Sequence, residues 1–277
     1  MSNLSLFDDA VDPTALCAAE IDAGALFVIN HSGGKDSQAM MIKLLEIVPV
    51  SQMLVVHASL GWMEWPGALE LAQQQAEDAG VPFIVARAAK SFLGMVANRF
   101  ATRPDAPSWP SAKHRQCTSD LKRGPITREV RRWADTNGFN RIVNCMGMRA
   151  EESSARAKKA VWKESVNHGV AGRSWYDWLP IHSISTVDVF ATIAAAGQKP
   201  HWAYLQGNER LSCVFCIMAS VNDLRIGATQ NPELYAEYCA LERHTGYTMH
   251  SSMKSLPELT GIEPDYTVQI VKWVSAA

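Results

Sequence analysis

The sequence predicts an α/β fold: a doubly wound, mostly parallel sheet followed by a helical cap at the C-terminal end. Two observations carry this prediction. Short apolar runs alternate with helix-like segments over residues 1–186, which is typical of a parallel sheet with helices on both faces. Beyond about residue 186 the strand-like runs stop and helical patterns dominate. We therefore expect an α/β domain over residues 1–186 and a helical region over residues 187–277.

Each expected element rests on its own residue pattern. The apolar runs that predict strands span residues 25–30, 52–58, 83–88, 141–146 and 174–180. The helix-like patterns follow residue 37 and span residues 66–79, 125–136, 188–196 and 232–244. Residues 91–116 contain three prolines and predict a long, mobile loop over a site.

The composition limits the class of protein. With 277 residues, 47% hydrophobic and 19% charged, the chain is typical of a globular protein of one domain, or of one domain with an appendage. Its apolar runs are shorter than the roughly 20 residues of a membrane span, and its acidic N-terminal residues do not resemble a secretory signal. A net charge of −2 argues against non-specific coating of nucleic acid. We expect a cytoplasmic protein without membrane contact.

The most informative segment is SGGKDS at residues 32–37, between the first predicted strand and the first predicted helix. Its two glycines permit close approach of an anion, and free N–H groups and the helix dipole would then face phosphates. Ser32 and Ser37 add hydroxyl donors, and Lys35 adds a positive charge. Neither GxxxxGK[ST] nor GxGxxG is present, which disfavours common kinases and dinucleotide oxidoreductases. The alternative is a glycine turn capped by Asp36 and Ser37.

This loop and several later segments resemble the PP-loop ATP pyrophosphatase superfamily (adenine nucleotide alpha hydrolase-like) and, within it, the phosphoadenosine phosphosulfate (PAPS) reductase family. The later segments are HASLG at 57–61, Cys117 with Lys122, Pro125 and Arg128, GMRAEES at 147–153 with Arg156, residues 180–189, and GNERLSCVFC at 207–216. One departure is Ile184, which replaces the family's tryptophan. The resemblance implies a doubly wound domain that binds ATP or an adenylyl sulfate. Members that use ATP release pyrophosphate and leave AMP on the substrate.

The resemblance and the residue chemistry together give a candidate site. Nucleotide contacts are expected from Ser32, Gly33, Gly34, Lys35, Asp36, Ser37, His57, Ala58, Gly147, Arg149 and Arg156. Catalytic roles, with Mg²⁺, are expected for Lys35, Asp36, Lys122 and Arg149. A guanidinium fork suits phosphate, and a lysine adds a second cationic clamp. Two alternatives stay open: Asp36 only caps the helix, and the basic residues only form surface pairs with Glu151 or Glu152.

Six cysteines in a chain without an export signal predict reduced thiols or metal ligands. The CxxC of Cys213 and Cys216 suits zinc or iron–sulfur ligation, a redox pair or two core cysteines. The resemblance adds Cys117 and implies a [4Fe–4S] cluster, with zinc as the alternative. Cluster-bearing reductases of the family have a Cys-Cys pair where this chain has Gln116 before Cys117, so either one iron stays open or a fourth ligand comes from elsewhere. The candidates for a fourth ligand are Cys145, Cys239, His114 and His201.

The family's two reactions make different demands on the sequence. Sulfonucleotide reductases use a cysteine near the C-terminus as nucleophile, and the last cysteine here is Cys239. The complete SGGKDS loop is instead expected of members that cleave ATP. These features are closest to the DNA phosphorothioation sulfur-transfer protein and to cluster-dependent thiolases. We therefore expect ATP-dependent activation of an acceptor coupled to sulfur transfer. The alternatives are a PAPS reductase that borrows Cys145 or Cys239, and a non-catalytic nucleotide sensor or assembly subunit.

The partners follow from the same hypothesis. Residues 113–132 contain seven Lys or Arg against two acids, and this basic segment could guide a tRNA or DNA acceptor or simply serve the nucleotide phosphates. Trp62, Trp65 and Trp109 lie near the expected site, where stacking on a base is an option. A sulfur donor or reductant protein and a second copy of the chain are further candidate partners. Cys17, Cys145 and Cys239 are expected to be buried core thiols.

Overall fold

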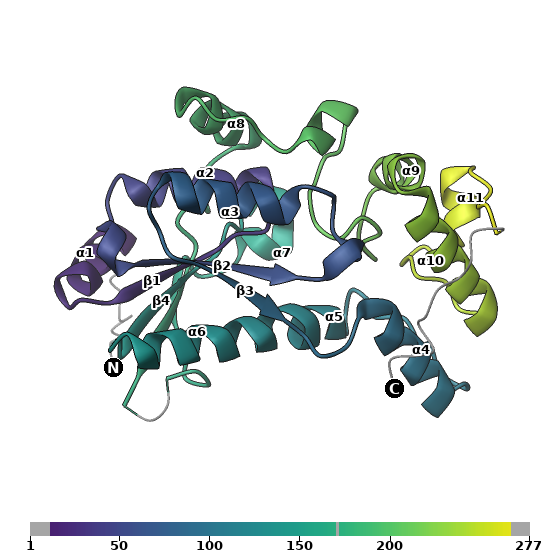
Figure 1. Ribbon diagram of the computed structural model, residues 1–277, viewed down its shortest axis with the longest axis horizontal. Coiled ribbons are helices and arrows are strands. Elements are labelled where there is room, and N and C mark those ends of the chain that lie inside the picture. Colours follow the sequence, from purple (N-terminus) through teal and green to yellow (C-terminus); the bar gives the residue numbers. More distant parts are fainter. Residues whose placement is uncertain (1–11, 170–171, 267–277) are drawn as a thin grey trace, which may run out of the picture.

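A six-stranded sheet forms the centre of the computed structural model, which describes residues 12–169 and 172–266 (Figure 1). The strands are β1 (Leu26–Asn30), β2 (Met53–Ser59), β3 (Phe83–Arg87), β4 (Arg141–Cys145), β5 (Trp162–Glu164) and β6 (Ser174–Trp178). Their order is β3-β2-β1-β4-β6-β5, and every pair is parallel except β5 with β6. The predicted α/β class is therefore confirmed, and the five predicted strands form within two residues of their expected ends.

Helices connect and cover these strands. The longer helices are α1 (Pro13–Asp22), α2 (Lys35–Leu45), α3 (Ala68–Asp78), α4 (Phe92–Thr102), α6 (Gly124–Thr136), α8 (Thr186–Ala195), α9 (Val221–Gln230) and α10 (Pro232–Thr245). Shorter helical turns are η1 (Val50–Gln52), η2 (Gly61–Met63), α5 (Gln116–Thr118), η3 (Ser119–Arg123), η4 (Ala150–Glu152), α7 (Ser154–Ala157), η5 (Trp202–Gln206) and α11 (Leu256–Thr260). Within the described residues after Trp178, the regular elements are all helical, as expected.

The central strand β1 is buried on both faces because it is paired with β2 and β4 and covered from two sides. Phe27 and Ile29 point to one face, where they pack with side chains of α1, α2 and α3. Leu26 and Val28 point to the opposite face, where they pack with Val130 and other side chains of α6. This alternation is the period-two pattern of a strand. It fixes a three-layer arrangement in which α2 and α3 lie on one side of the sheet and α6 on the other (Figure 1).

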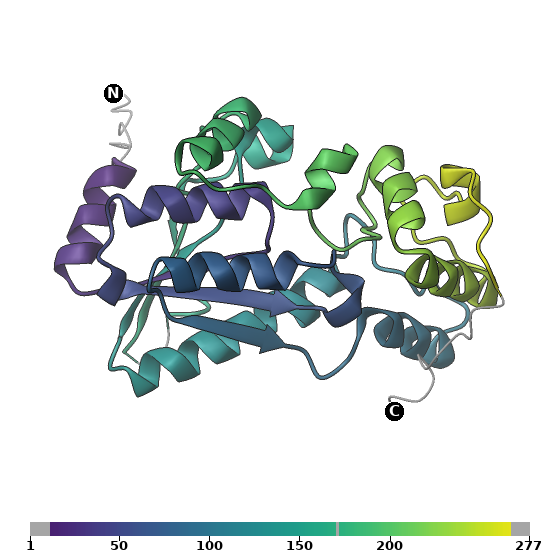
Figure 2. The same cartoon turned by 45° about the horizontal axis from the view of Figure 1, so that its top comes forward.

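A separate hydrophobic cluster lies beyond the carboxyl ends of the strands and forms the cap. It contains side chains of α4, α9, α10 and α11 and of residues 211–217. Both views place these helices at the end of the molecule opposite α1 (Figures 1 and 2). Trp65 and Phe92, which precede residue 186, belong to the same cluster. The boundary near residue 186 therefore stays a prediction, since the cap shares its core with earlier residues.

Residues 91–116 correct one expectation. We predicted a long loop there, but α4 occupies Phe92–Thr102 and only the residues that follow it, which contain the three prolines, are irregular up to α5. Ser91 caps α4, accepting from the Gly94 amide at 3.0 Å, and the apolar face of the helix packs into the cap cluster. The prolines do not interrupt the helix because all of them come after its last turn. The short edge strand β5 had no recognisable apolar run and was not predicted.

Two expectations from the sequence involve residues at the two ends of the chain. Residues 1–11, on which the absence of a secretory signal was argued, and residues 267–277, which contain no cysteine, lie outside the described residues. In the part of the chain that the structure describes, no helix combines the length and apolar character needed to cross a membrane.

Candidate functional site

The glycine loop, residues 32–37, leads from the carboxyl end of β1 into the first turn of α2. Gly33 has φ +74, and a Cβ there would lie 2.3 Å from the Ala68 carbonyl oxygen at the start of α3. Gly34 lies against Tyr204, where a Cβ would be 3.2 Å from the hydroxyl oxygen. The first position therefore requires glycine twice, for its backbone angle and for its space. The loop is a close-packed turn whose shape the neighbouring α3 and η5 determine.

Only part of the loop's N–H groups remain for a ligand. The Ser32 amide donates to Ser37 Oγ at 3.2 Å, and the Lys35 amide donates to the Tyr204 hydroxyl at 3.0 Å. The Gly33 amide donates to Nδ1 of His31 at 3.1 Å. The remaining amides, of Gly34, Asp36 and Ser37, belong to the start of α2, where a helix has no internal acceptors for its first donors. We expected the amides of the whole loop to face phosphate, but only those at the N-terminus of α2 are free to do so.

His31 is a structural residue of the loop that sequence reasoning missed. It is buried, and its Nε2 lies 2.5 Å from Oε1 of Gln75. Because Nδ1 accepts the Gly33 amide, the neutral ring carries its proton on Nε2 and donates it to Gln75. Burial lowers the pKa of His31 to about 4, which keeps the ring neutral. Its place directly before SGGKDS was the only signal in the sequence.

Three charged residues form a cluster at the start of α2. Arg149 Nε donates to Asp36 Oδ1 at 2.6 Å, and Lys35 Nζ donates to Asp36 Oδ2 at 3.2 Å. Lys35 also donates to the Glu209 carbonyl oxygen at 3.2 Å and lies over the Tyr204 ring. Lys35 and Arg149 are both buried, and neither lines the cavity described next. They hold Asp36 in place, whereas Asp36 itself borders the cavity.

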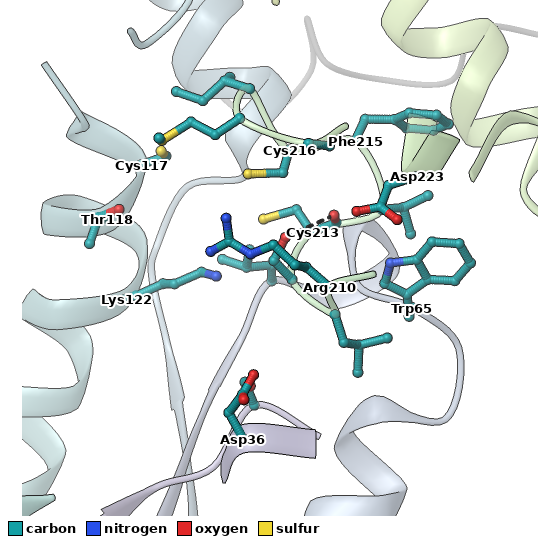
Figure 3. Close-up of a pocket in the computed structure, with 18 of the residues that line it drawn as sticks. Asp36, Trp65, Cys117, Thr118, Lys122, Arg210, Cys213, Phe215, Cys216 and Asp223 are labelled. Carbon is teal, nitrogen blue, oxygen red and sulfur yellow. Dashed lines mark hydrogen bonds between the residues drawn. The ribbon is translucent and has the colours of Figure 1, made fainter. Parts of the chain in front are cut away.

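A cavity of about 280 Å³ opens between the glycine loop and the cap (Figure 3). Of the expected site residues, Ser32, Asp36, Ser37, Cys117, Lys122, Gly147, Arg156, Cys213 and Cys216 line it. The other expected residues, Gly33, Gly34, Lys35, His57, Ala58 and Arg149, do not line it. The structure thus brings together in one cavity residues that are far apart in the sequence. Glu152, Arg210 and Asp223 also line it and were not among the expected site residues.

Three thiols, of Cys117, Cys213 and Cys216, lie at the cap end of this cavity and are called here the cavity thiols (Figure 3). Lys122 reaches toward them from η3. Burial raises the pKa of the Cys213 thiol, and the Lys122 ammonium opposes this rise. In return, the charge of Cys213 raises the pKa of Lys122. The net shift of the Cys213 pKa is upward, so Lys122 only partly offsets the cost of a buried thiolate.

One of the cavity thiols, Cys213, is tied through Glu64 to the segment that follows β2. A backbone bridge joins Glu64 to Cys213, and the Val214 amide donates to the Met63 carbonyl at 3.0 Å. The Glu64 carboxylate accepts the Leu60 amide and lies 2.6 Å from Nε2 of His57, whose other nitrogen lies 2.8 Å from the His31 carbonyl. His57 is therefore engaged inside the protein. Its predicted contact with nucleotide, and that of the adjacent Ala58, stays a prediction.

The proposed sources of a fourth metal ligand lie away from the cavity. Cys145 and Cys239 are 0% and 3% exposed, and burial raises the pKa of both thiols. His201 is buried and engaged by the Pro66 carbonyl and the Ala203 amide. His114 is exposed and lines a different hollow. Within residues 12–169 and 172–266, no three His, Cys, Asp or Glu side chains are arranged to hold a metal ion.

The tryptophans expected near the site have different environments. Trp65 is buried and lines the cavity, with an edge-to-face contact to Trp202. Trp109 is buried, and its ring packs with Phe92 and Tyr238 in the cap cluster. Trp62 is half exposed, at 52%, and does not line the cavity. The structure therefore leaves Trp65 as the tryptophan with access to a ligand there.

The chain is similar to known proteins over much of its length. Residues 27–219 match the model of the phosphoadenosine phosphosulfate reductase domain. An uncharacterized 37.8 kDa protein in the gpa 5′ region of Escherichia phage 186 is 32% identical over 135 residues, which is 49% of this chain and 39% of that protein. The chain therefore spans about two fifths of the length of this relative.

Solved structures show weaker similarity. A phosphoadenylyl-sulfate (PAPS) reductase from Candida auris, in a phosphate complex, has 13% identity and a TM-score of 0.47, covering 76% of this chain and 98% of its own. An FMN adenylyltransferase from Candida glabrata, in complex with FAD and inorganic pyrophosphate, has 9% identity and a TM-score of 0.41. That alignment covers 76% of this chain and 68% of the other.

The close contact at Gly33 predicts the effect of a single methyl group. Gly33→Ala should reduce the free energy of unfolding by the left-handed backbone cost of roughly 1–2 kcal/mol and by an added clash with Ala68. Gly24→Ala is the matched control, because Gly24 has φ +69 and no atom within 4 Å of the place that a Cβ would occupy. Urea unfolding of both variants measures the difference. Equal losses would contradict the claim that α3 shapes the loop.

The buried neutral His31 predicts acid sensitivity. Its pKa of about 4 lies below the ordinary 6.5, so between these values the unfolded chain binds a proton that the folded protein excludes. The free energy of unfolding should therefore fall by about 3 kcal/mol from this group as the pH drops from 6.5 to 4. His31→Gln should remove this part of the pH dependence, and His114→Gln, an exposed control, should not. Parallel pH profiles for wild type and His31→Gln would contradict the assignment.

Proposed function

The chain belongs to the phosphoadenosine phosphosulfate reductase family, and from this premise we propose that it activates an acceptor with ATP and then transfers sulfur to it. Membership in this family supports a nucleotide-binding enzyme of the PP-loop class. The observation that carries the finer proposal is that Asp36 and Ser37 of the glycine loop and the three cavity thiols border one cavity (Figure 3). A phosphate held at the loop and a sulfur atom held at the thiols would therefore share one space.

The nucleotide end of the cavity is proposed to hold the triphosphate. The unpaired first-turn donors of α2 and its helix dipole favour negative charge, and Ser32 and Ser37 border the same space. Gly147 supports this turn, because a Cβ there would lie 3.1 Å from the Asp36 backbone and 3.2 Å from the Ser37 amide nitrogen. Arg156 adds a guanidinium to the wall. These groups would stabilise the charge on the departing pyrophosphate.

Lys35 and Arg149 are proposed to act through Asp36 and not by direct contact with phosphate. Each donates to one oxygen of the Asp36 carboxylate, so that carboxylate already has two cations. Because both of its oxygens already accept hydrogen bonds from cations, the Asp36 carboxylate is a poor direct ligand for Mg²⁺. We propose that Mg²⁺ arrives on the triphosphate with most of its waters. Asp36 then orients the first turn of α2 through these two ion pairs and not as a cap, since the N-cap is Gly34 and no side chain makes a capping hydrogen bond there.

Zinc and an iron–sulfur cluster make different demands on the residues at the thiol end. A zinc ion needs four ligands converging on one point, with sulfur at about 2.3 Å, and the described residues contain no such group. A [4Fe–4S] cluster binds thiolates at different irons, so its ligands surround a body instead of a point. The lack of a converged ligand group among the described residues counts against both metals, so the preference for the cluster is supported by the three thiols that line one cavity and by the resemblance to cluster-bearing members of the family. Cys117, Cys213 and Cys216 would hold it, and when bound it supplies a site for inorganic sulfide.

The proposed reaction balances without an external oxidant or reductant. An acceptor oxygen attacks the α-phosphorus of ATP, the bond to the bridging oxygen breaks, and pyrophosphate leaves with that electron pair. Hydrosulfide then displaces AMP, which departs with the acceptor's oxygen and leaves sulfur in its place. Lys122 and Arg210 reach into the space between Asp36 and the sulfur atoms (Figure 3). There they would balance the negative charge of the hydrosulfide and of the departing AMP. A sulfur donor protein could replace free hydrosulfide.

The alternative of a sulfonucleotide reductase receives less support. That reaction needs a thiol nucleophile with access to the bound substrate. Cys145 and Cys239, the two candidates, are buried, and burial raises the pKa of each thiol. Neither lines the cavity. The third option, a nucleotide sensor without turnover, is an outcome of the test below.

The acceptor is proposed to approach the exposed basic segment. Lys113, Arg115, Arg123, Arg128 and Arg132 are exposed. Glu129 pairs with the last two of these, which reduces their charge, whereas Arg115 also lines the cavity. A polyanion such as tRNA or DNA matches this charge. Self-association and a cytoplasmic location remain expectations from the sequence.

ATP cleavage tests the proposal. Anaerobically purified protein with Mg²⁺, hydrosulfide and tRNA or DNA should release AMP and pyrophosphate from ATP labelled at the α-phosphate. Lys35→Ala should reduce the rate by roughly 10²-fold or more, because Asp36 and the Glu209 carbonyl lose their shared donor. Lys43→Ala, on the exposed side of the same helix, is the matched control. ATP binding without cleavage at the α-phosphate under all these conditions would instead indicate a sensor.

Metal content tests the thiol end separately. The anaerobic protein should be brown, absorb broadly near 400 nm and contain about four irons per chain. Cys117→Ala and Cys213→Ala should each lose this absorbance, whereas Cys17→Ala, a buried cysteine outside the cavity, should retain it. Colourless protein with about one zinc per chain would contradict the cluster and favour a structural metal.

A further inference from the structure

Glu152 pairs with two arginines that line the cavity. Its carboxylate pairs with Arg156, and its Oε1 lies 3.4 Å from a terminal nitrogen of Arg210. Oε2 also accepts the Arg149 amide at 3.0 Å. All three ion-pairing side chains, of Glu152, Arg156 and Arg210, line the cavity. The Glu152 side chain is only 10% exposed, so its charge is held within the protein wall.

The two arginines belong to different parts of the chain. Arg156 lies on α7, which follows β4, and Arg210 lies in the segment that leads to Cys213. Asp223 fixes this segment by accepting the Glu209 amide at 2.8 Å, and it also accepts the Arg210 amide. One carboxylate therefore links the sheet side of the cavity with the segment that supplies two of the cavity thiols.

The same geometry that holds a carboxylate suits a phosphate. A guanidinium presents paired N–H donors to two oxygens of either group. Arg210 keeps a 45% exposed side chain, so part of its guanidinium remains open to the cavity and solvent. In Figure 3 this side chain points into the space between Asp36 and Cys213. An anionic ligand entering there meets two cations and one resident negative charge.

We propose that Glu152 is a resident counter-ion, which an anionic group of the bound nucleotide displaces from Arg156 and Arg210. Arg210 thereby becomes an anion clamp on the segment of Cys213 and Cys216, and nucleotide binding is coupled to the position of that segment. This inference rests on the proposed function, because it requires a nucleotide in the cavity. Glu152 is a positioning residue in this account, since it acts through the two arginines.

Binding measurements separate this role from a merely structural one. Glu152→Gln keeps the shape of the side chain and its oxygen acceptor but removes the charge. The dissociation constants for ATP and for inorganic pyrophosphate, measured by calorimetry, should both fall about tenfold. Loss of a structural contact would weaken binding instead. Arg210→Gln should raise both constants about tenfold, and the gain from Glu152→Gln should shrink in the double variant, because the two side chains interact.

Asp105→Asn is the matched control, since Asp105 pairs with Arg103 on the exposed surface outside the cavity. It should leave both dissociation constants unchanged. Unchanged or weaker binding in folded Glu152→Gln overturns the inference, and so does unchanged binding in Arg210→Gln, which tests it even if the first variant does not fold. If wild-type protein binds neither ATP nor pyrophosphate, the proposed function itself fails.

Discussion

The Asp36 carboxylate, shared between Lys35 and Arg149, is the interaction on which the arrangement of the site depends. Arg149 comes from the segment after β4, and Lys35 extends to the Glu209 carbonyl near the cysteine segment. The first turn of α2 is thereby fixed to both walls of the cavity. Both cations are buried, and Asp36 is the only carboxylate that pairs with Lys35 in the described residues, whereas Arg149 also pairs with Glu151 at 2.7 Å. Removal of the Asp36 carboxylate would therefore leave the buried Lys35 charge unpaired, a far larger cost than loss of a surface pair.

The cavity exists because a parallel sheet and a helical cap meet at the carboxyl edge of the strands. Open α/β sheets bind ligands at this edge, where loops leave the strands and helices begin. Here β1 supplies the glycine loop, and the residues after β4 supply Gly147, Glu152 and Arg156. The cap closes the opposite side with Cys213 and Cys216. The fold thus places residues of the glycine loop and the three cavity thiols around one space, and the proposed function rests on this arrangement.

The sequence predicted the sheet and the glycine loop because both depend on local patterns. The continuous apolar run along β1 and the two glycines before α2 are visible without tertiary information. The directions of Lys35 and Arg149 were not visible, because their partners are set by tertiary contacts, such as Glu209 for Lys35. The helix α4 was hidden by the prolines that follow it. From the sequence, Glu152 was expected only as a surface partner for basic residues. Its ion pair with Arg210 depends on the tertiary contact between the segment after β4 and the segment before Cys213, which the sequence does not reveal.

The central claim is that nucleotide and cavity thiols share one space. A crystal structure of the anaerobically purified protein with α,β-methylene ATP tests it most directly. The account predicts the triphosphate at the first turn of α2, with the α-phosphate facing Cys117, Cys213 and Cys216 across the cavity. A nucleotide bound elsewhere, or one whose α-phosphate is screened from these cysteines by protein, would contradict it.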